Sequence, residues 1–144
     1  MKYFTINELC KSTTATKLGI NNNPPAAVKT NLENLVKHVL DPLREAYGKP
    51  IGVYSGYRSN ALNKAVNGAK NSQHLTGTAA DIHGANSTEN RRLYDLVLRM
   101  QLPFDQMILE KGTKTNPQWI HISFNPKNNR KQTLYYNGKS YVRI

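Results

Sequence analysis

The chain has 144 residues, of which 38% are hydrophobic and 20% are charged. This composition is typical of one globular domain with its own core and argues against a disordered segment. The formal net charge is +11, so the chain attracts polyanions such as nucleic acid, anionic membranes or cell-envelope polymers, without naming one of them. No apolar run approaches the ~20 residues of a membrane helix, and we expect no transmembrane segment.

The N-terminal region is predicted to contain one short helix and a loop. Thr5 and Glu8 fit a capping box, which predicts that a helix starts near Ile6. Cys10, the only cysteine, excludes an internal disulfide and a cysteine-rich zinc site, and we expect it to be a buried thiol. The polar stretch 12–25 is predicted to be a loop.

A long amphipathic helix is predicted next. Apolar residues recur at helical spacing over 28–43. Pro42 should kink or restart this helix, with Asp41 capping the restart, and Gly48 should end it. His38 falls on the polar edge of the helix, where we expect it to be solvated.

The second half of the chain is predicted to be mostly strands around one further helix. Ser87 is expected to cap that helix, and Asn137-Gly138 predicts a C-terminal hairpin within 132–144. The expected strands before the hairpin are 51–54, 78–82, 106–109 and 119–124. The fold class is therefore α+β in a single domain, 1–144, with a small, mostly antiparallel sheet and N-terminal helices packed on one side.

Two histidines and one aspartate form a candidate metal site. His74 and Asp81 lie in the densest motif of the chain, and Gly77 between them can let the chain turn. A catalytic zinc takes three protein ligands and leaves one position for water, whose pKa it lowers. His83 lies two residues past Asp81 on the same expected face, where we interpret it as a cleft residue rather than a rival ligand.

The third candidate ligand is His121. The alternation over 119–123 places Trp119, His121 and Ser123 on one face of a strand. A buried polar side chain needs a partner, so for His121 alone a hydrogen-bonded core histidine is the simpler interpretation. The combination with His74 and Asp81 favours a metal ligand.

Three motifs together resemble a known family. They are Ser55-Gly56-Tyr57-Arg58-Ser59, then S-x-H-x-x-G-x-A-x-D over 72–81, then W-x-H-x-S over 119–123. In order and rough spacing, over about 32–124, they are similar to the zinc D-Ala-D-Ala carboxypeptidases and L-alanyl-D-glutamate endopeptidases, cell-wall metallopeptidases that include phage lysins. The resemblance implies one catalytic Zn²⁺ on the open face of a helix-backed sheet, held by His74, Asp81 and His121.

The same resemblance assigns residues to the substrate. Arg58 matches an arginine that binds a substrate carboxylate or the polarised carbonyl, a task for which a two-donor guanidinium is suited. A surface salt bridge is the alternative for Arg58. Ser72, Gln73 and Trp119 are expected to line the cleft and contact substrate.

The general base departs from the family pattern. Many members carry a carboxylate three residues before the last histidine, where this chain has Gln118, which cannot act as a base. We expect Glu110 to take this role, because the strand that it ends should pair with the His121 strand and bring it close to Gln118. The alternative for Glu110 is a strand-end carboxylate beside Lys111. Asp105 is interpreted as a turn or helix-end cap.

The resemblance implies zinc-dependent hydrolysis of peptide bonds in peptidoglycan stem peptides, by a carboxypeptidase or an endopeptidase. The main alternative is a non-catalytic zinc- or wall-binding domain, which Gln118 favours. A basic nucleic-acid-binding protein is a further alternative, but no recognised motif supports it. The N-terminus carries no signal-peptide pattern, so we expect a monomer made in the cytoplasm that acts at the bacterial cell wall after release.

Overall fold

The computed structural model describes residues 1–144 and confirms the α+β class. No helix combines the length and the apolar character that a membrane-spanning segment requires. The helical elements are α1 (Ile6–Cys10), α2 (Thr13–Leu18), α3 (Ala26–Leu35), the π-helical turn η1 (Val36–Leu40), α4 (Asp41–Tyr47), α5 (Asn60–Ala65), the 3₁₀ turn η2 (Gln73–Thr76) and α6 (Ser87–Arg99). The strands are β1 (Gly52–Ser55), β2 (Ala79–His83), β3 (Gln106–Glu110), β4 (Trp119–Ser123), β5 (Gln132–Tyr136) and β6 (Tyr141–Arg143).

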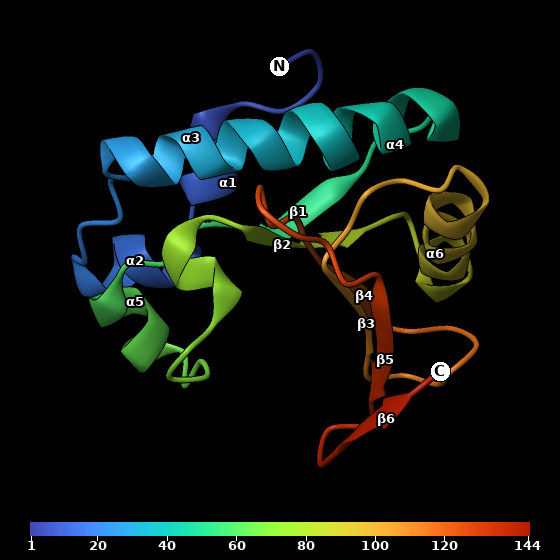
Figure 1. Cartoon of the computed structure of the whole chain (residues 1–144). Coiled ribbons are helices and arrows are strands. Elements are labelled where there is room, and N and C mark those ends of the chain that lie inside the picture. The colour runs from blue at the N-terminus through green and yellow to red at the C-terminus, as the bar shows by residue number, and fades with distance from the viewer.

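The six strands form one sheet in the order β1-β2-β4-β3-β5-β6. Every neighbouring pair is antiparallel except β3 and β5, which run parallel. The predicted C-terminal hairpin is confirmed as β5 and β6, with Tyr136 opposite Tyr141. In Figure 1 this hairpin lies at the far end of the sheet from β1.

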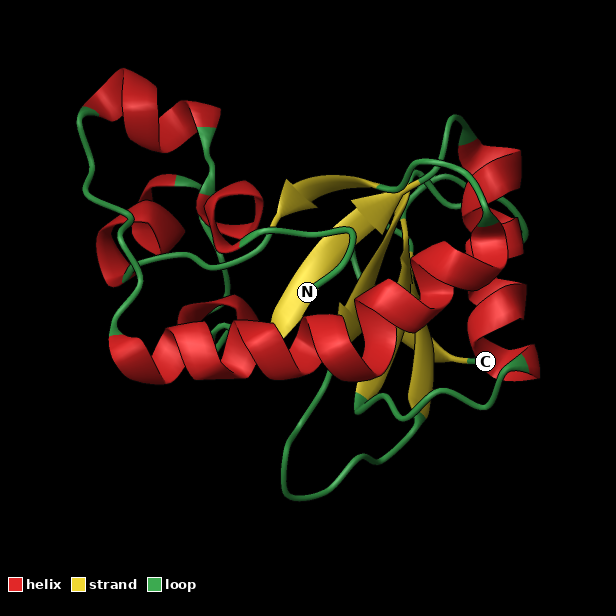
Figure 2. Ribbon diagram, turned by 90° about the horizontal axis from the view of Figure 1, so that it is seen from above, coloured by secondary structure: helices red, strands yellow, loops and turns green.

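One face of the sheet carries the hydrophobic core. Alternate residues of the central strands, including Ile82, Leu109 and Ile120, are fully buried in a cluster with the apolar side chains of the long helix and α6. Figure 2 shows the long helix, from α3 to α4, lying across the sheet. The opposite set of alternate residues faces away from this helix and includes Asp81 and His121, as predicted for an open-face metal site.

The N-terminal loop prediction is wrong in part, because 12–25 contains helix α2. The Ser12 hydroxyl accepts a hydrogen bond from the Ala15 N–H, and Gly19 ends the helix in the left-handed conformation. The predicted α1 is confirmed, with the Thr5 hydroxyl accepting from the Glu8 N–H. Cys10, expected to be buried, is only partly so.

The long helix continues through Pro42 without a break. The π-helical turn η1 lets the Asp41 N–H bond to the Val36 carbonyl five residues earlier, which widens the helix just before the proline. Asp41 therefore does not cap a restart. Its carboxylate accepts hydrogen bonds from the N–H groups of Lys2 and Tyr3 instead.

Two smaller predictions also need correction. Asn86, rather than Ser87, caps α6, with its side chain accepting from the Glu89 N–H. His38 is not simply solvated, because its ring stacks on Phe124 with centroids 4.7 Å apart.

The segment 55–59, which contains Arg58, is packed tightly between α1 and η2. The Tyr57 N–H donates to the Leu9 carbonyl over 2.8 Å, and the Arg58 N–H donates to the His74 carbonyl over 3.0 Å. A Cβ at Gly56 would overlap the backbone of Leu9. Glycine is therefore required at position 56, where the backbone lies against that of Leu9. The same segment holds the turn η2 in place through the hydrogen bond from Arg58 to His74.

Replacing Gly56 with Ala should lower the free energy of unfolding by about 1–3 kcal/mol, because the new methyl group meets backbone that cannot move away. Urea unfolding checks this. Gly19→Ala is the control, since nothing lies within 4 Å of a Cβ there and only its positive φ is strained. If Gly56→Ala lowers the free energy of unfolding no more than Gly19→Ala does, close packing at Gly56 is contradicted.

Candidate functional site

The three predicted metal ligands meet on the open face of the sheet. His74 lies in η2, while Asp81 on β2 is directly opposite His121 on β4. One potential ligand atom from each residue lies within 4.8 Å of the others. The Asp81 Oδ1 is 3.3 Å from the His74 Nε2 and 3.1 Å from the His121 Nδ1. Segments far apart in the sequence thus form one compact donor set.

Each imidazole is oriented by a hydrogen bond at its other nitrogen. The His74 Nδ1 lies 2.6 Å from the Gly56 carbonyl oxygen, so it must carry the proton and leave Nε2 free. The His121 Nε2 lies 3.0 Å from the Gln73 Oε1, which leaves Nδ1 free. Such outer hydrogen bonds fix the tautomer of metal-binding histidines. The two free nitrogens are the ones that face Asp81.

The Asp81 carboxylate is kept charged by its surroundings. Burial alone raises the pKa of Asp81, but the neighbouring imidazoles of His74 and His121 outweigh this, and the pKa lies well below its usual value. The three residues are each at most 8% exposed. A buried carboxylate with two imidazoles is a donor set that fits zinc.

Glu110 and the three candidate ligands line one cavity, and this cavity has a volume of about 360 Å³. On β3, Ile108 pairs with His121 and Glu110 pairs with Trp119, so both β3 side chains share the face of the ligands. Burial and the nearby Asp81 carboxylate raise the pKa of Glu110 to about 7. The surroundings therefore shift the pKa values of the two carboxyl groups in opposite directions, downward for Asp81 and upward for Glu110.

Arg58 also lines this cavity and is held from two sides. Its Nε donates to the Ser55 hydroxyl over 3.0 Å, and its Nη1 donates to the Asn63 Oδ1 over 2.9 Å. Its Nη2 lies 3.7 Å from the Asp81 Oδ2. Burial lowers the pKa of Arg58, and the carboxylates of Asp81 and Glu110 oppose this effect. The guanidinium is thus fixed beside the ligands, not in a surface salt bridge.

A second cavity of about 690 Å³ adjoins the first, and Asp81 and Trp119 line both. Tyr54 and His83 line it with their rings stacked 4.0 Å apart. His83 is outside the donor set, as expected for a cleft residue. Gln118 also faces this second cavity, while its N–H donates to the Glu110 carbonyl over 2.9 Å.

Gln73 belongs to a hydrogen-bond chain that the sequence did not reveal. Its Oε1 accepts from His121, and its Nε2 donates to the Asp105 Oδ2 over 3.1 Å. Asp105 in turn accepts two hydrogen bonds from the Arg130 guanidinium, which lowers the pKa of Asp105. Asp105 is therefore not a simple turn cap, since it anchors the amide that orients His121. Ser72, also in the cavity, caps η2 by accepting from the His74 N–H.

Replacing Gln73 with Ala should weaken zinc binding roughly 10–100-fold, the usual cost of losing a group that orients a ligand. The reason is that His121 loses the acceptor that keeps Nδ1 free. Competition with a chromogenic chelator measures the affinity. Gln132→Ala is the matched control, because that glutamine bonds to Gln106 and touches no ligand. Equal affinities in the two variants would refute the orienting role.

Comparison with known proteins agrees with this geometry. The sequence model of the family described as Peptidase M15 matches residues 2–123, so the match starts well before the motifs that suggested it. No curated protein gives a significant match. A match over most of the chain, together with the His74, Asp81 and His121 donor set, establishes that the chain belongs to the Peptidase M15 family of metallopeptidases.

Proposed function

We propose that the protein hydrolyses peptide bonds in peptidoglycan stem peptides with a single zinc ion, at the bacterial cell wall. The observation that carries the proposal is one cavity that combines the three-residue donor set with Glu110 and Arg58. A hydrolase of this kind needs a metal position, a base and a cation for the substrate, and all three occur within this cavity. The membership of the Peptidase M15 family supports the substrate class.

His74, Asp81 and His121 would hold the zinc. Two free imidazole nitrogens and one charged carboxylate are three protein ligands, which is the number that catalytic zinc sites use. A bound zinc ion supplies Lewis-acid chemistry that activates water and polarises the scissile carbonyl. The low pKa of Asp81 keeps its negative charge available to the cation throughout the neutral range.

Glu110 is the proposed general base. Its carboxylate takes a proton from the attacking water and delivers it to the nitrogen of the leaving amine. A pKa of about 7 suits both halves of this task, because the group can lose and regain a proton near neutral pH. The pairing of β3 with β4 supports the role, since it puts Glu110 on the same face as His121.

Arg58 is the proposed anchor for substrate oxygen. With Nε and Nη1 held by Ser55 and Asn63, its remaining N–H groups can bind a carboxylate or the carbonyl oxygen. Trp119 is proposed to contact the peptide where the two cavities meet. Ser72 and Gln73 also line the cleft and are proposed to contact substrate beside their bonds to His74 and His121.

The proposal is tested by digestion of purified peptidoglycan with the zinc-loaded protein. We expect soluble peptide fragments, loss of all release after chelation, and recovery when zinc is returned. Mass analysis of the fragments identifies the bond and so separates a carboxypeptidase from an endopeptidase of the endolysin or wall-remodelling type. Fragment release that survives chelation would refute a metal mechanism, and no release from any preparation would refute the proposed activity.

The second candidate, a domain that binds zinc and wall without cutting, is favoured by Gln118 at the position of the family's usual base. Replacing Glu110 with Ala separates the two functions. The digestion rate should fall roughly 10²–10⁴-fold because the proton carrier is lost, while bound zinc stays near one per chain. The exposed Glu33→Ala variant is the control. A Glu110→Ala protein that digests wall normally would remove Glu110 from the mechanism.

A further inference from the structure

The C-terminal hairpin extends the metal-binding face of the sheet beyond the part of the chain that the family matches. That match ends at residue 123, before β5 and β6 begin. The face of the sheet that contains Glu110 continues onto the hairpin, because Glu110 pairs with Tyr136 on β5, and Tyr136 pairs with Tyr141 on β6. Paired residues lie on the same side of a sheet. Tyr136 and Tyr141 therefore share the side of Glu110 and His121.

Tyr141 reaches the reaction cavity itself. Its side chain lines the same cavity as the metal ligands, Arg58 and Glu110, although it lies sixty residues from Asp81 in the sequence. Its ring packs on Tyr136 with centroids 4.5 Å apart and an interplanar angle of 31°. Tyr141 nevertheless remains 58% exposed. A large aromatic side chain is thus fixed on one face and open to the cavity on the other.

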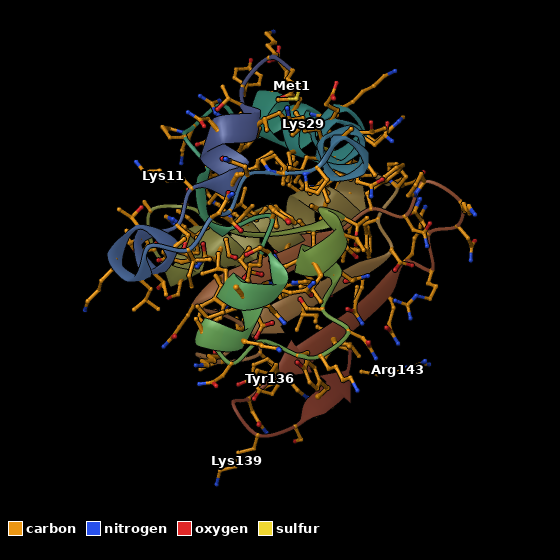
Figure 3. The ribbon with its side chains drawn as sticks, turned by 90° about the vertical axis from the view of Figure 1, so that its left-hand side faces the viewer. Met1, Lys11, Lys29, Tyr136, Lys139 and Arg143 are labelled. Carbon is orange, nitrogen blue, oxygen red and sulfur yellow. The ribbon has the colours of Figure 1, made fainter.

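The chain around this tyrosine is cationic. After Glu110 the sequence contains no Asp or Glu, but it contains Lys and Arg at positions 111, 114, 127, 130, 131, 139 and 143. Arg143 pairs with Leu134 across the hairpin and so shares the side of Tyr141. Figure 3 shows Lys139 at the tip of the hairpin, pointing away from the body of the protein. This edge of the cavity suits a peptide that carries carboxylates.

We propose that Tyr141 is a substrate-contacting residue of this peptidase, with its ring forming one wall of the peptide cleft and its phenol donating a hydrogen bond to the substrate. The proposal rests on the peptide-hydrolase function proposed above. The hairpin and Arg58 line the cavity that holds the metal ligands, so a peptide bound there contacts both. The phenol is protonated at neutral pH and can donate a hydrogen bond, and burial and the nearby Glu110 carboxylate raise its pKa further.

A purely structural role for Tyr141 makes different predictions. If the ring only packed on Tyr136, its removal would change stability and leave substrate affinity unchanged. Val142 provides the matched control, because it is the next residue on the same strand, is 41% exposed and points to the opposite side of the sheet. The two positions share the same edge strand but differ in whether they face the cavity.

The test uses zinc-loaded wild type, Tyr141→Phe, Tyr141→Ala and Val142→Ala with a soluble stem-peptide fragment. We measure kcat and KM for hydrolysis, the dissociation constant by calorimetry, bound zinc and the melting temperature. We expect Tyr141→Ala to raise KM and the dissociation constant about 10-fold or more and Tyr141→Phe to raise them roughly 2–10-fold, the range of a single lost hydrogen bond. Bound zinc should not change, and Val142→Ala should bind like wild type.

The outcomes separate this inference from the function on which it rests. If wild type cuts or binds the peptide and Tyr141→Ala has the same affinity as Val142→Ala, the role of Tyr141 is overturned and the hydrolase function is not. Wild type that binds without cutting overturns the hydrolase, while the dissociation constants still decide the role of Tyr141. Wild type that neither binds nor cuts overturns both.

Discussion

The site depends on one buried carboxylate held between two imidazoles. Asp81 and His121 occupy opposite positions on neighbouring strands, and His74 approaches them from the turn η2. Removing a charged carboxylate from water is costly unless opposite charge or hydrogen-bond donors compensate. The protein places this group on the sheet face away from the core, where a cation can satisfy it. The register between β2 and β4 therefore determines whether Asp81 and His121 can bind the same metal ion.

Hydrogen bonds from neighbouring residues orient the two imidazoles toward the position that a metal ion would occupy. The Gly56 carbonyl and the Gln73 amide each hold one imidazole, and they leave free the nitrogens that face Asp81. Gly56 is itself fixed by the backbone packing against α1, while Gln73 is fixed by Asp105. The orientation of the two imidazoles thus depends on the N-terminal helices and, through Asp105, on Arg130 in the segment after β4. Figure 1 shows the N-terminal helices beside the sheet and the C-terminal strands at its far edge.

Local sequence patterns predicted the parts of the fold that depend on neighbouring residues. Alternation predicted the strand of His121, and the Asn137-Gly138 turn predicted the hairpin. The motifs indicated His74, Asp81 and His121 as candidate ligands, and the structure brings these three side chains together. The α2 helix was missed because its cap at Ser12 lies in a polar stretch with no amphipathic repeat.

Contacts between distant segments could not be read from the sequence. The parallel pairing of β3 with β5 depends on how the chain returns after β4, and that pairing brings the hairpin beside Glu110. Asp105 looked like a turn residue, because nothing local indicates that Arg130 and Gln73 would both reach it. The continuous helix through Pro42 similarly depends on a π-helical turn that has no simple sequence signal.

The most direct test of the central claim is a ¹⁵N NMR experiment on the imidazoles during zinc titration of the chelator-treated protein. We expect saturation at one zinc per chain, with the metal on Nε2 of His74 and Nδ1 of His121. The opposite nitrogen of each ring should keep its proton throughout the titration. Zinc that leaves these two imidazoles unchanged, or that binds through the other nitrogens, would rule out His74 and His121 as ligands in the arrangement proposed.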